Sequence, residues 1–202
     1  WEKYEDELLD RMGSDNKIVR LILNRAKTEP KRVVFAEADQ LDVMKAAQII
    51  YDEGIGTPVL LGNRETIAEL MEELDFEADI EIIDPKTPEE KEKLNKYANI
   101  YWQERKRKGV TLFDAQKLMR QRNYYASMMV NVGDADAMIT GYSSSYPSAV
   151  KPVLEVIGAA PNVQKVAAAN LMNTSRGPLF LADTSINIEP TAKELAKIAL
   201  MT

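Results

Sequence analysis

The sequence predicts an α/β fold built around a parallel β-sheet, and two observations lead to this prediction. Between residues 31 and 83, short apolar runs alternate with amphipathic helical segments, an order typical of parallel sheets with right-handed crossovers. Between residues 137 and 157, a fourth apolar run ends in a serine-rich loop, and a new helix opens at Pro147. The 202 residues suffice for one large domain or for one and a half small ones.

The individual elements follow from the apolar spacing and from the residues that start or stop each segment. The first part of the chain is expected to hold helix at 1–27, strand at 32–36, helix at 41–53, strand at 57–61, helix at 65–74 and strand at 78–83. The rest is expected to hold helices at 88–108, 111–119 and 122–132, strand at 137–140, helix at 148–157, strands at 166–171 and 179–182, and helix at 191–199. We place a soft domain division near residue 140, where a second set of strands begins.

Composition excludes several classes of function. The net charge of −6 argues against nucleic-acid binding by the whole surface. Cysteine and histidine are both absent, so disulfides, thiolate zinc sites and Ser-His-Asp triads are excluded. No apolar run approaches the ~20 residues of a membrane span, and the acidic start at residues 1–10 does not resemble a signal peptide. We therefore expect a cytoplasmic protein, and the lack of a starting methionine suggests a piece of a longer chain.

The strongest candidate site is the loop from Gly141 to Pro147. It follows a strand and precedes a helix, which is where α/β proteins bind anions through free backbone N–H groups and the helix dipole. The hydroxyls of Ser143, Ser144 and Ser145 add donors for phosphate oxygens, and the Lys151 ammonium lies about one helical turn further on. The alternative is an ordinary capping loop, since Ser is a favoured N-cap and Pro a favoured first helical residue. The loop is not a P-loop, because no Gly-Lys-Ser or Gly-Lys-Thr sequence occurs.

Other charged residues near this loop have a structural and a functional interpretation. Asp134 and Asp136 form a carboxylate pair that is able to hold a metal or do acid–base chemistry, but we favour a polar turn because no third ligand lies nearby. Four arginines precede the loop and are either phosphate contacts or a solvated face: Arg105, Arg107, Arg120 and Arg122. Local sequence does not choose among them, and we take Arg122 as the candidate ligand contact.

A second group of candidates lies in the last part of the chain. Asp183 and Asn187 follow an apolar strand, and strand carboxyl ends host ligands in open α/β sheets. Arg176 is a further possible contact for the same reason. The alternative is a turn that precedes the helix after Pro190.

Four segments together resemble the phosphate acetyl/butyryl transferase family. They are Gly109–Thr111, Met119–Tyr125, Gly133–Met138 and Leu181–Ala192, and their order and spacing match over nearly the whole chain. Within the family, the loop Tyr142–Pro147, the segment from Arg176 to Leu181 and the leading segment 1–30 look like the transferase-like C-terminal region of bacterial NADP-dependent malic enzymes.

The resemblance implies a three-layer α/β/α fold in two domains that dimerises. It divides the chain into linker helices at 1–30, a first α/β domain at 31–140 and the start of a second at 141–202. Active members exchange acetyl groups between acetyl phosphate and coenzyme A, with the acyl phosphate on the serine-rich loop. The family's catalytic Ser, Arg and Asp lie in a C-terminal third with no counterpart in residues 1–202, so we expect no catalytic residue here. The family's Arg-Pro is Lys151-Pro152 in this chain, which keeps the charge but loses the bidentate fork.

Two functional hypotheses and a third, simpler one follow from this resemblance. The preferred one is a regulatory and oligomerising region of an NADP-dependent malic enzyme, an oxidoreductase that decarboxylates malate to pyruvate. It would bind acetyl-CoA or acetyl phosphate without activity of its own, while NADP and a divalent metal sit in the malic enzyme core joined in cis. The alternative is part of an active phosphate acetyltransferase, and the third is an oligomerising scaffold with an empty loop. A homo-oligomer is expected in each case, with neither nucleic acid nor a membrane as partner.

Overall fold

The computed structural model describes residues 15–161, 163, 165–174 and 177–202. These residues fall into two compact units, which are treated separately. The larger unit is Ala26–Gly158, and the smaller combines residues 15–25 with the segment from Ala159 onward. The larger unit therefore extends past residue 140 and includes the serine-rich loop with the helix that follows it.

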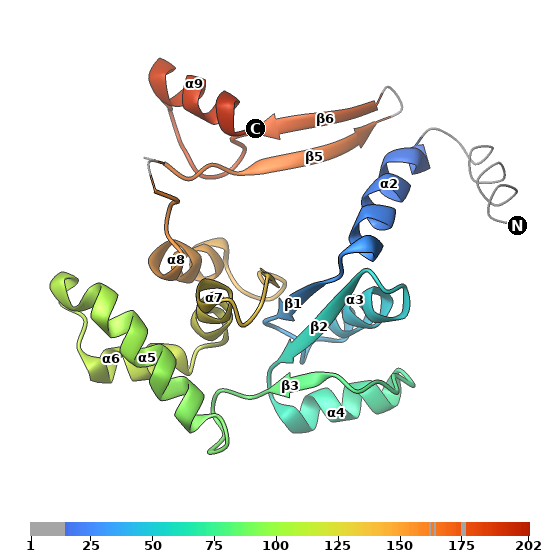
Figure 1. Cartoon of the computed structure of the whole chain (residues 1–202), viewed down its shortest axis with the longest axis vertical. Helices are drawn as coiled ribbons and strands as arrows, with labels where there is room; N and C mark the ends of the chain where they lie inside the picture. The colour runs from blue at the N-terminus through green and yellow to red at the C-terminus, as the bar shows by residue number, and fades with distance from the viewer. Residues whose placement is uncertain (1–14, 162, 164, 175–176) are drawn as a thin grey trace, which may run out of the picture. The chain divides into compact units, whose positions relative to one another are not determined.

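The larger unit is built on a four-stranded, all-parallel sheet with the order β3-β2-β1-β4 (Figure 1). Its strands are β1 (Lys31–Phe35), β2 (Gly56–Leu61), β3 (Glu81–Ile83) and β4 (Ala137–Ile139). The chain adds β2 and β3 on one side of β1 and then returns, more than fifty residues later, to place β4 on the other side. The reversal of strand order lies between β1 and β4, and ligands in open α/β sheets bind at such a point.

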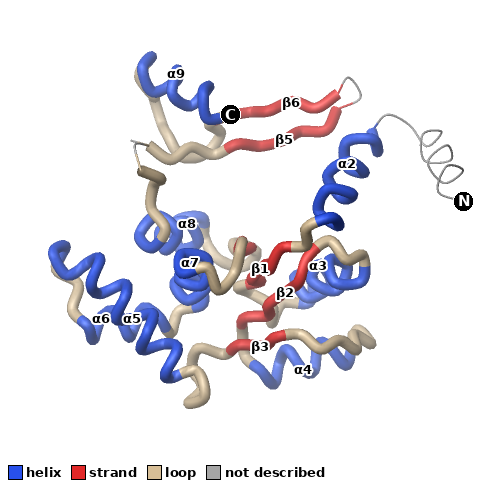
Figure 2. Tube along the Cα trace, viewed as in Figure 1, coloured by secondary structure: helices blue, strands red, loops and turns tan. Residues whose placement is uncertain are grey.

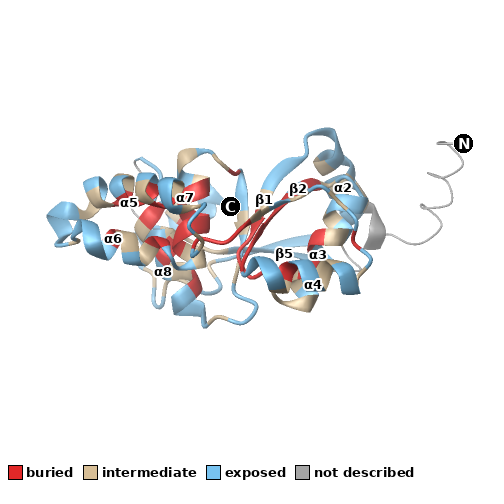
Figure 3. Cartoon of the chain, turned by 90° about the horizontal axis from the view of Figure 1, so that it is seen from below, coloured by how far each residue is buried: buried red, intermediate tan, exposed pale blue. Residues whose placement is uncertain are grey.

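Helices cover both faces of this sheet (Figures 2 and 3). Successive strand residues point to opposite faces, and accordingly Phe35 and Leu60 belong to one apolar cluster while Val34 and Leu61 belong to the other. The first cluster is completed by α3 (Leu41–Asp52) and α4 (Arg64–Glu73). The second is completed by four helices: α5 (Lys91–Arg105), α6 (Leu112–Met119), α7 (Arg122–Val132) and α8 (Tyr146–Val156). The predicted parallel α/β fold is confirmed, with helix, sheet and helix layers.

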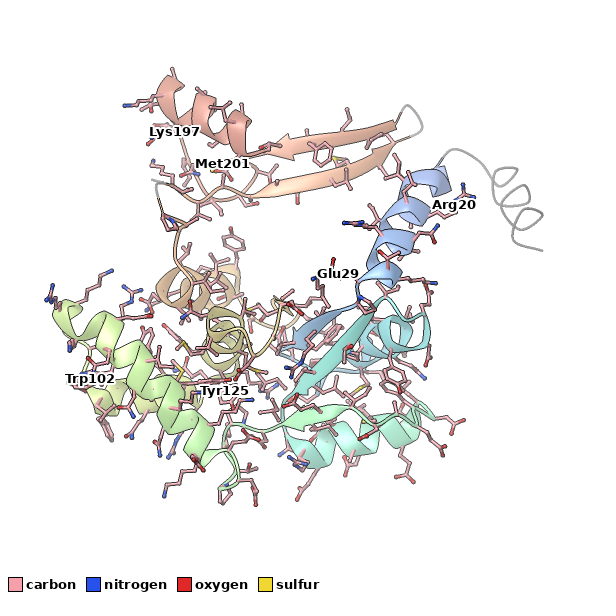
Figure 4. The ribbon with its side chains drawn as sticks, in the orientation of Figure 1. Arg20, Glu29, Trp102, Tyr125, Lys197 and Met201 are labelled. Carbon is pink, nitrogen blue, oxygen red and sulfur yellow. The ribbon has the colours of Figure 1, made fainter. Side chains whose placement is uncertain are left out.

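Four tyrosines form the centre of the second cluster, on α5 and α7. Tyr97 and Tyr125 pack edge to face with ring centroids 5.0 Å apart, and Tyr101 and Tyr124 do so at 5.9 Å. Each hydroxyl donates to a carboxylate at the edge of the cluster, so the rings are buried while their polar ends are satisfied. Tyr125, labelled in Figure 4, is fully buried.

The smaller unit contains an antiparallel hairpin and a terminal helix. Strands β5 (Ala169–Thr174) and β6 (Gly177–Ala182) pair from Ala169–Ala182 to Thr174–Gly177. Helix α9 (Ala192–Met201) begins at a capping box between Thr191 and Glu194, and Lys165 pairs with Glu194 at 2.6 Å. Helix α2 (Asp15–Thr28) precedes β1. Among the described residues, no helix is both long and apolar enough to cross a bilayer.

Several predicted boundaries were wrong. The strand expected at 78–83 is reduced to Glu81–Ile83, because only these residues find partners on β2. The helix expected at 88–108 begins at Lys91 and ends as α5 at Arg105, after which a 3₁₀ turn (Lys106–Lys108) leads to Gly109 at φ 87°. The strand expected at 166–171 is shifted to Ala169–Thr174, because pairing with β6 draws the polar Asn173 and Thr174 into the ladder. Residues 1–14 of the helical region expected at 1–27 lie outside the described residues.

The capping box of α6 provides a local test of the fold. The Thr111 hydroxyl accepts from the backbone N–H of Asp114 at 3.1 Å, and the Asp114 carboxylate accepts from the Thr111 backbone N–H at 3.2 Å. Replacing Thr111 by Ala is expected to lower the free energy of unfolding by about 1 kcal/mol, because an N-terminal donor loses its acceptor. Urea denaturation measures the change, and Thr111→Ser, which keeps the hydroxyl, should recover most of it. Equal losses for both variants would contradict the role of the cap.

Candidate functional site

The candidate site forms where β1 and β4 end side by side. The two strands are in register at Phe35 and Ile139, and the Ala36 N–H donates to the Ile139 carbonyl at 3.0 Å. Glu37 and Gly141 therefore each lie two residues beyond a register pair. Because the carboxyl ends of neighbouring parallel strands open on the same edge, the Glu37 side chain meets the serine-rich loop there.

The loop binds an anion, and that anion is the chain's own Glu37 carboxylate. Its Oε2 atom accepts from the backbone N–H groups of Gly141 at 2.9 Å and Tyr142 at 2.7 Å. Its Oε1 atom accepts from the backbone N–H of Ser143 at 3.2 Å, from the Ser143 hydroxyl at 2.7 Å and from the Ser144 hydroxyl at 2.8 Å. Glu37 is only 5% exposed. The sequence-based expectation of anion-binding donors thus describes the loop's chemistry, and an internal carboxylate uses those donors.

The electrostatics of Glu37 follow from two opposing effects. Burial of the carboxyl group disfavours its charged form and raises its pKa, which is the largest single influence. Hydrogen bonds from the Ser143 and Ser144 side chains and from the backbone of Tyr142 and Gly141 act the other way, and together they lower the pKa of Glu37 to about 2. Glu37 is therefore ionised at neutral pH and stabilised as an anion by the loop.

A cavity of about 300 Å³ opens beside Glu37 and the loop. Its walls include the candidates Arg122, Ser143 and Ser144, and also four polar residues that the sequence analysis did not single out: Gln40, Gln121, Asn123 and Ser148. The Arg122 guanidinium donates to the Asp39 carboxylate at 2.6 Å, so its charge is already paired. An incoming phosphate would compete with Asp39 for Arg122 and with Glu37 for the loop.

Two of the predicted contacts lie elsewhere on the same segment. Ser145 is the N-cap residue of α8, and its hydroxyl makes a hydrogen bond with the Ser148 hydroxyl at 2.8 Å. Lys151 is exposed on α8 and is not among the residues that line the cavity. The structure therefore brings Ser143, Ser144 and Arg122 together, and leaves Ser145 and Lys151 outside that group.

Asp134 and Asp136 act as hydrogen-bond acceptors that secure the strand start. The Asp134 carboxylate accepts from the Tyr97 hydroxyl and lies 3.7 Å from the Lys93 ammonium. The Asp136 carboxylate accepts from the Arg32 backbone N–H at 2.8 Å, beside the pairing of β1 with β4. In the part of the chain that the structure describes, no three His, Cys, Asp or Glu side chains gather as metal ligands would.

Asp183 and Asn187 organise the turn before α9. The Asp183 carboxylate accepts from the backbone N–H groups of Ala168 at 3.0 Å and Asn187 at 2.8 Å, and from the Asn187 side chain. These donors, led by the Ala168 backbone N–H, hold the pKa of Asp183 well below its usual range despite the opposing effect of burial. Asn187 also donates to the Val166 carbonyl at 3.0 Å. Both residues belong to the smaller unit, and Arg176 lies outside the described residues.

The remaining arginines of the predicted cluster separate in space. Arg105 donates through Nε to the Glu155 carbonyl at 3.0 Å and so joins α5 to α8. Arg107 is exposed in the 3₁₀ turn. Arg120 lines a different cavity, whose described lining residues lie between positions 85 and 120. Only Arg122 of the four lines the cavity beside the serine-rich loop.

The sequence analysis missed Glu37, which is the central residue of the site. Glu37 lies directly after an apolar strand, and this position could have indicated a site. An acidic side chain that is buried next to a strand needs a hydrogen-bonding or charged partner. The missing information was the strand order: only the pairing of β1 with β4 places Glu37 opposite a loop 104 residues away.

Comparison with known proteins assigns the family. The family model described as phosphate acetyl/butaryl transferase matches residues 17–202. The chain belongs to the phosphate acetyl/butyryl transferase family. A phosphate acetyltransferase of Thermoanaerobacterium thermosaccharolyticum is 34% identical over 91% of this chain and 56% of its own length. The EutD phosphotransacetylase structure from Staphylococcus aureus superposes with a TM-score of 0.80 at 27% identity, over 92% of this chain and 55% of that one.

Relatives within the family are of two kinds. An NADP-dependent malic enzyme of Haemophilus influenzae is 31% identical over 100% of this chain and 27% of its own length. The malic enzymes among these relatives align with 97–100% of the chain, whereas the phosphate acetyltransferases align with 89–91%. The chain thus spans about half of the first transferase and about a quarter of the malic enzymes. It is a phosphate acetyltransferase-like domain related to both, and the predicted resemblance to the malic enzyme region is confirmed.

Proposed function

We propose that this chain is the transferase-like regulatory region of an NADP-dependent malic enzyme, and that it binds acetyl-CoA or acetyl phosphate without catalysing transfer. The observation that carries the proposal is the extent of alignment: malic enzymes match residues that the family model, which begins at residue 17, leaves out. The leading segment of this chain thus aligns with malic enzymes and lies outside the residues that the family model matches.

The serine-loop cavity supports a sensing role over a catalytic one. Its donors already hold Glu37, and its Arg122 is paired with Asp39. A phosphate group gains little net free energy when it must displace a resident carboxylate, because each new hydrogen bond replaces an existing one. We therefore propose a site of modest affinity, in which the phosphate of the ligand takes over part of the Glu37 contacts and so changes the loop between β4 and α8.

The alternative is part of an active phosphate acetyltransferase. The 34% identity to the Thermoanaerobacterium enzyme and the superposition on EutD favour it. An acetyl-transfer assay separates the two functions, because only the alternative requires turnover of acetyl phosphate and coenzyme A by the full-length protein. A rate of acetyl transfer that rises with protein concentration would refute our proposal that the chain binds its ligand without catalysing transfer.

The direct test is a titration of the full-length protein with acetyl-CoA while malate oxidation is followed through NADPH absorbance. We expect the rate to change with acetyl-CoA, and the half-maximal concentration to rise at least tenfold in Arg122→Gln, which loses the guanidinium of the cavity. Arg107→Gln is the matched control, since Arg107 is exposed and outside the cavity. A rate that does not respond, together with no calorimetric binding of acetyl-CoA or acetyl phosphate, would refute the proposal.

A further inference from the structure

We propose that a second cavity, between the β3–α5 loop and α6, binds a nucleotide-type ligand: phosphates at its basic end and a planar base on Phe113. This basic cavity measures about 400 Å³, within the range of small-molecule sites. It shares no lining residue with the serine-loop cavity. The two cavities are therefore distinct, and variants of each cavity test them separately.

Three basic residues, all exposed, line the basic cavity. Lys86 comes from the β3–α5 loop, Lys91 from the first turn of α5 and Arg120 from the end of α6. No ion pair or side-chain hydrogen bond engages these three groups within the described chain, and no carboxylate is among the described lining residues. In a protein with a net charge of −6, three basic side chains around one cavity, without an ion-pair partner among the described residues, favour an anionic ligand.

Of the neighbouring acidic side chains, Glu89 interacts with the side chain of Thr87 in the cavity wall, whereas Asp84 and Glu90 make their contacts elsewhere. The Asp84 carboxylate accepts from the Lys86 backbone N–H at 3.0 Å, which shapes the loop without neutralising the Lys86 side chain. The Glu90 carboxylate accepts from the Tyr125 hydroxyl at 2.9 Å, on the side of the tyrosine cluster. This differs from the serine-loop cavity, where Asp39 pairs with Arg122.

Two amides complete the polar wall between α5 and α6. The Gln116 side chain donates to the Asn95 side-chain oxygen at 3.0 Å, which fixes both groups. The Asn95 side-chain N–H groups make no hydrogen bond to described residues and remain available to a phosphate oxygen. The site therefore combines charge with a fixed neutral donor, as phosphate-binding sites do.

A smaller hollow adjoins the basic cavity, and it is the reason why we propose a nucleotide as the ligand. It measures about 150 Å³ and shares Gln116 and Arg120 with the basic cavity, while adding Phe113 and Lys117. Phe113 is 74% exposed, so its side chain is accessible to a ligand in this hollow. A planar base would stack on the Phe113 ring, and Arg120, which lines both hollows, would contact both parts of the ligand.

The test uses the full 202-residue chain, with ADP and inorganic pyrophosphate as probes in calorimetry at low salt. We expect ADP to bind more tightly than pyrophosphate, and both to weaken as salt is raised. Lys91→Gln and Arg120→Gln should each raise the dissociation constant of both probes at least fivefold. Phe113→Ala should weaken ADP at least threefold while leaving pyrophosphate unchanged. Arg107→Gln is the control for loss of one surface charge.

Nuclear magnetic resonance locates the site. ADP should shift the amide signals of residues 85–95 and 113–120 and leave those of residues 141–148 in place. Three results would overturn the proposal: no binding of either probe, binding that Arg122→Gln abolishes and Arg120→Gln does not, or equal affinity for ADP and pyrophosphate with no effect of Phe113→Ala. Because the substituted side chains lie on the surface of the cavity, thermal denaturation should show that all variants remain folded.

Discussion

Replacing Glu37 by Gln is expected to lower the free energy of unfolding of the larger unit by about 3 kcal/mol at neutral pH. Folding lowers the pKa of this carboxyl group from 4.5 to about 2, and a shift of that size corresponds to about 3 kcal/mol of stability. The buried carboxylate satisfies five donors of the loop, and an amide offers only one oxygen in its place. The Ser143 and Ser144 hydroxyls are able to rotate and accept from the new N–H groups, but the backbone donors are not. Equilibrium unfolding in urea measures the loss.

The pH dependence gives the same variant a second readout. Because the pKa of Glu37 is lower in the folded state, its contribution is fully present above pH 4.5 and is lost as the pH falls towards about 2. The difference in unfolding free energy between the unmodified chain and Glu37→Gln should therefore shrink over that interval. Glu104→Gln, an exposed change on α5, is the matched control and should cost less than about 0.5 kcal/mol at any of these pH values. A difference between Glu37→Gln and the unmodified chain that does not change with pH would contradict an ionised Glu37.

Replacing Tyr125 by Ala is expected to cost about 3–5 kcal/mol, the range for removing a fully buried aromatic side chain from a core. The ring packs edge to face on Tyr97, and its loss would leave a cavity between α5 and α7. Tyr125→Phe keeps the ring and removes only the hydrogen bond to Glu90, so it should cost about 1 kcal/mol. Urea unfolding, with near-ultraviolet circular dichroism as a probe of ring packing, measures both.

A double-mutant cycle tests whether the two rings act as a pair. Tyr97→Ala and Tyr125→Ala together should cost less than the sum of the single changes by about 1 kcal/mol, since each single change already removes the shared contact. Tyr146→Ala, at a residue that is 52% exposed on α8, is the control and should cost under about 1 kcal/mol. Strict additivity at the buried pair would contradict the coupling.

Local patterns predicted the fold class because each strand and helix of the larger unit carries its own signal. The apolar run through Val34 and Phe35 forms β1, Gly54 follows the end of α3 with a positive φ, and Asn63 caps α4, which are the roles typical of these residue types. The hairpin of β5 and β6 was harder to predict, because its antiparallel ladder extends through polar residues that have no apolar alternation.

Of the candidate site, only the hydrogen-bond donors of the serine-rich loop could be predicted from the sequence. The position of the loop after a buried strand and the identity of its hydroxyls indicated anion binding, and Ser143 and Ser144 do hold an anion. The partner is specified by the order of strands in the sheet, which local spacing does not encode. The same limit applies to Arg120 and Arg122, which are two residues apart in sequence yet line different cavities, because Arg120 is the C-cap residue of α6 and Arg122 is the first residue of α7.

The closure of Glu37 onto the loop also has a consequence for how the chain folds. The contact joins residues 104 to 107 positions apart, and five α-helices and three strands lie between them in the chain. Loop-closure entropy makes such long-range contacts late events, whereas the pairing of β1 with β2 needs a far shorter chain segment. During synthesis, β1 and Glu37 leave the ribosome before the loop that donates to the Glu37 carboxylate. That carboxylate lacks its hydrogen-bond donors until about a hundred further residues have been made. The loop after β4 therefore reports whether the larger unit has finished folding. Its amide hydrogens become protected from exchange only in molecules in which β4 has joined the sheet.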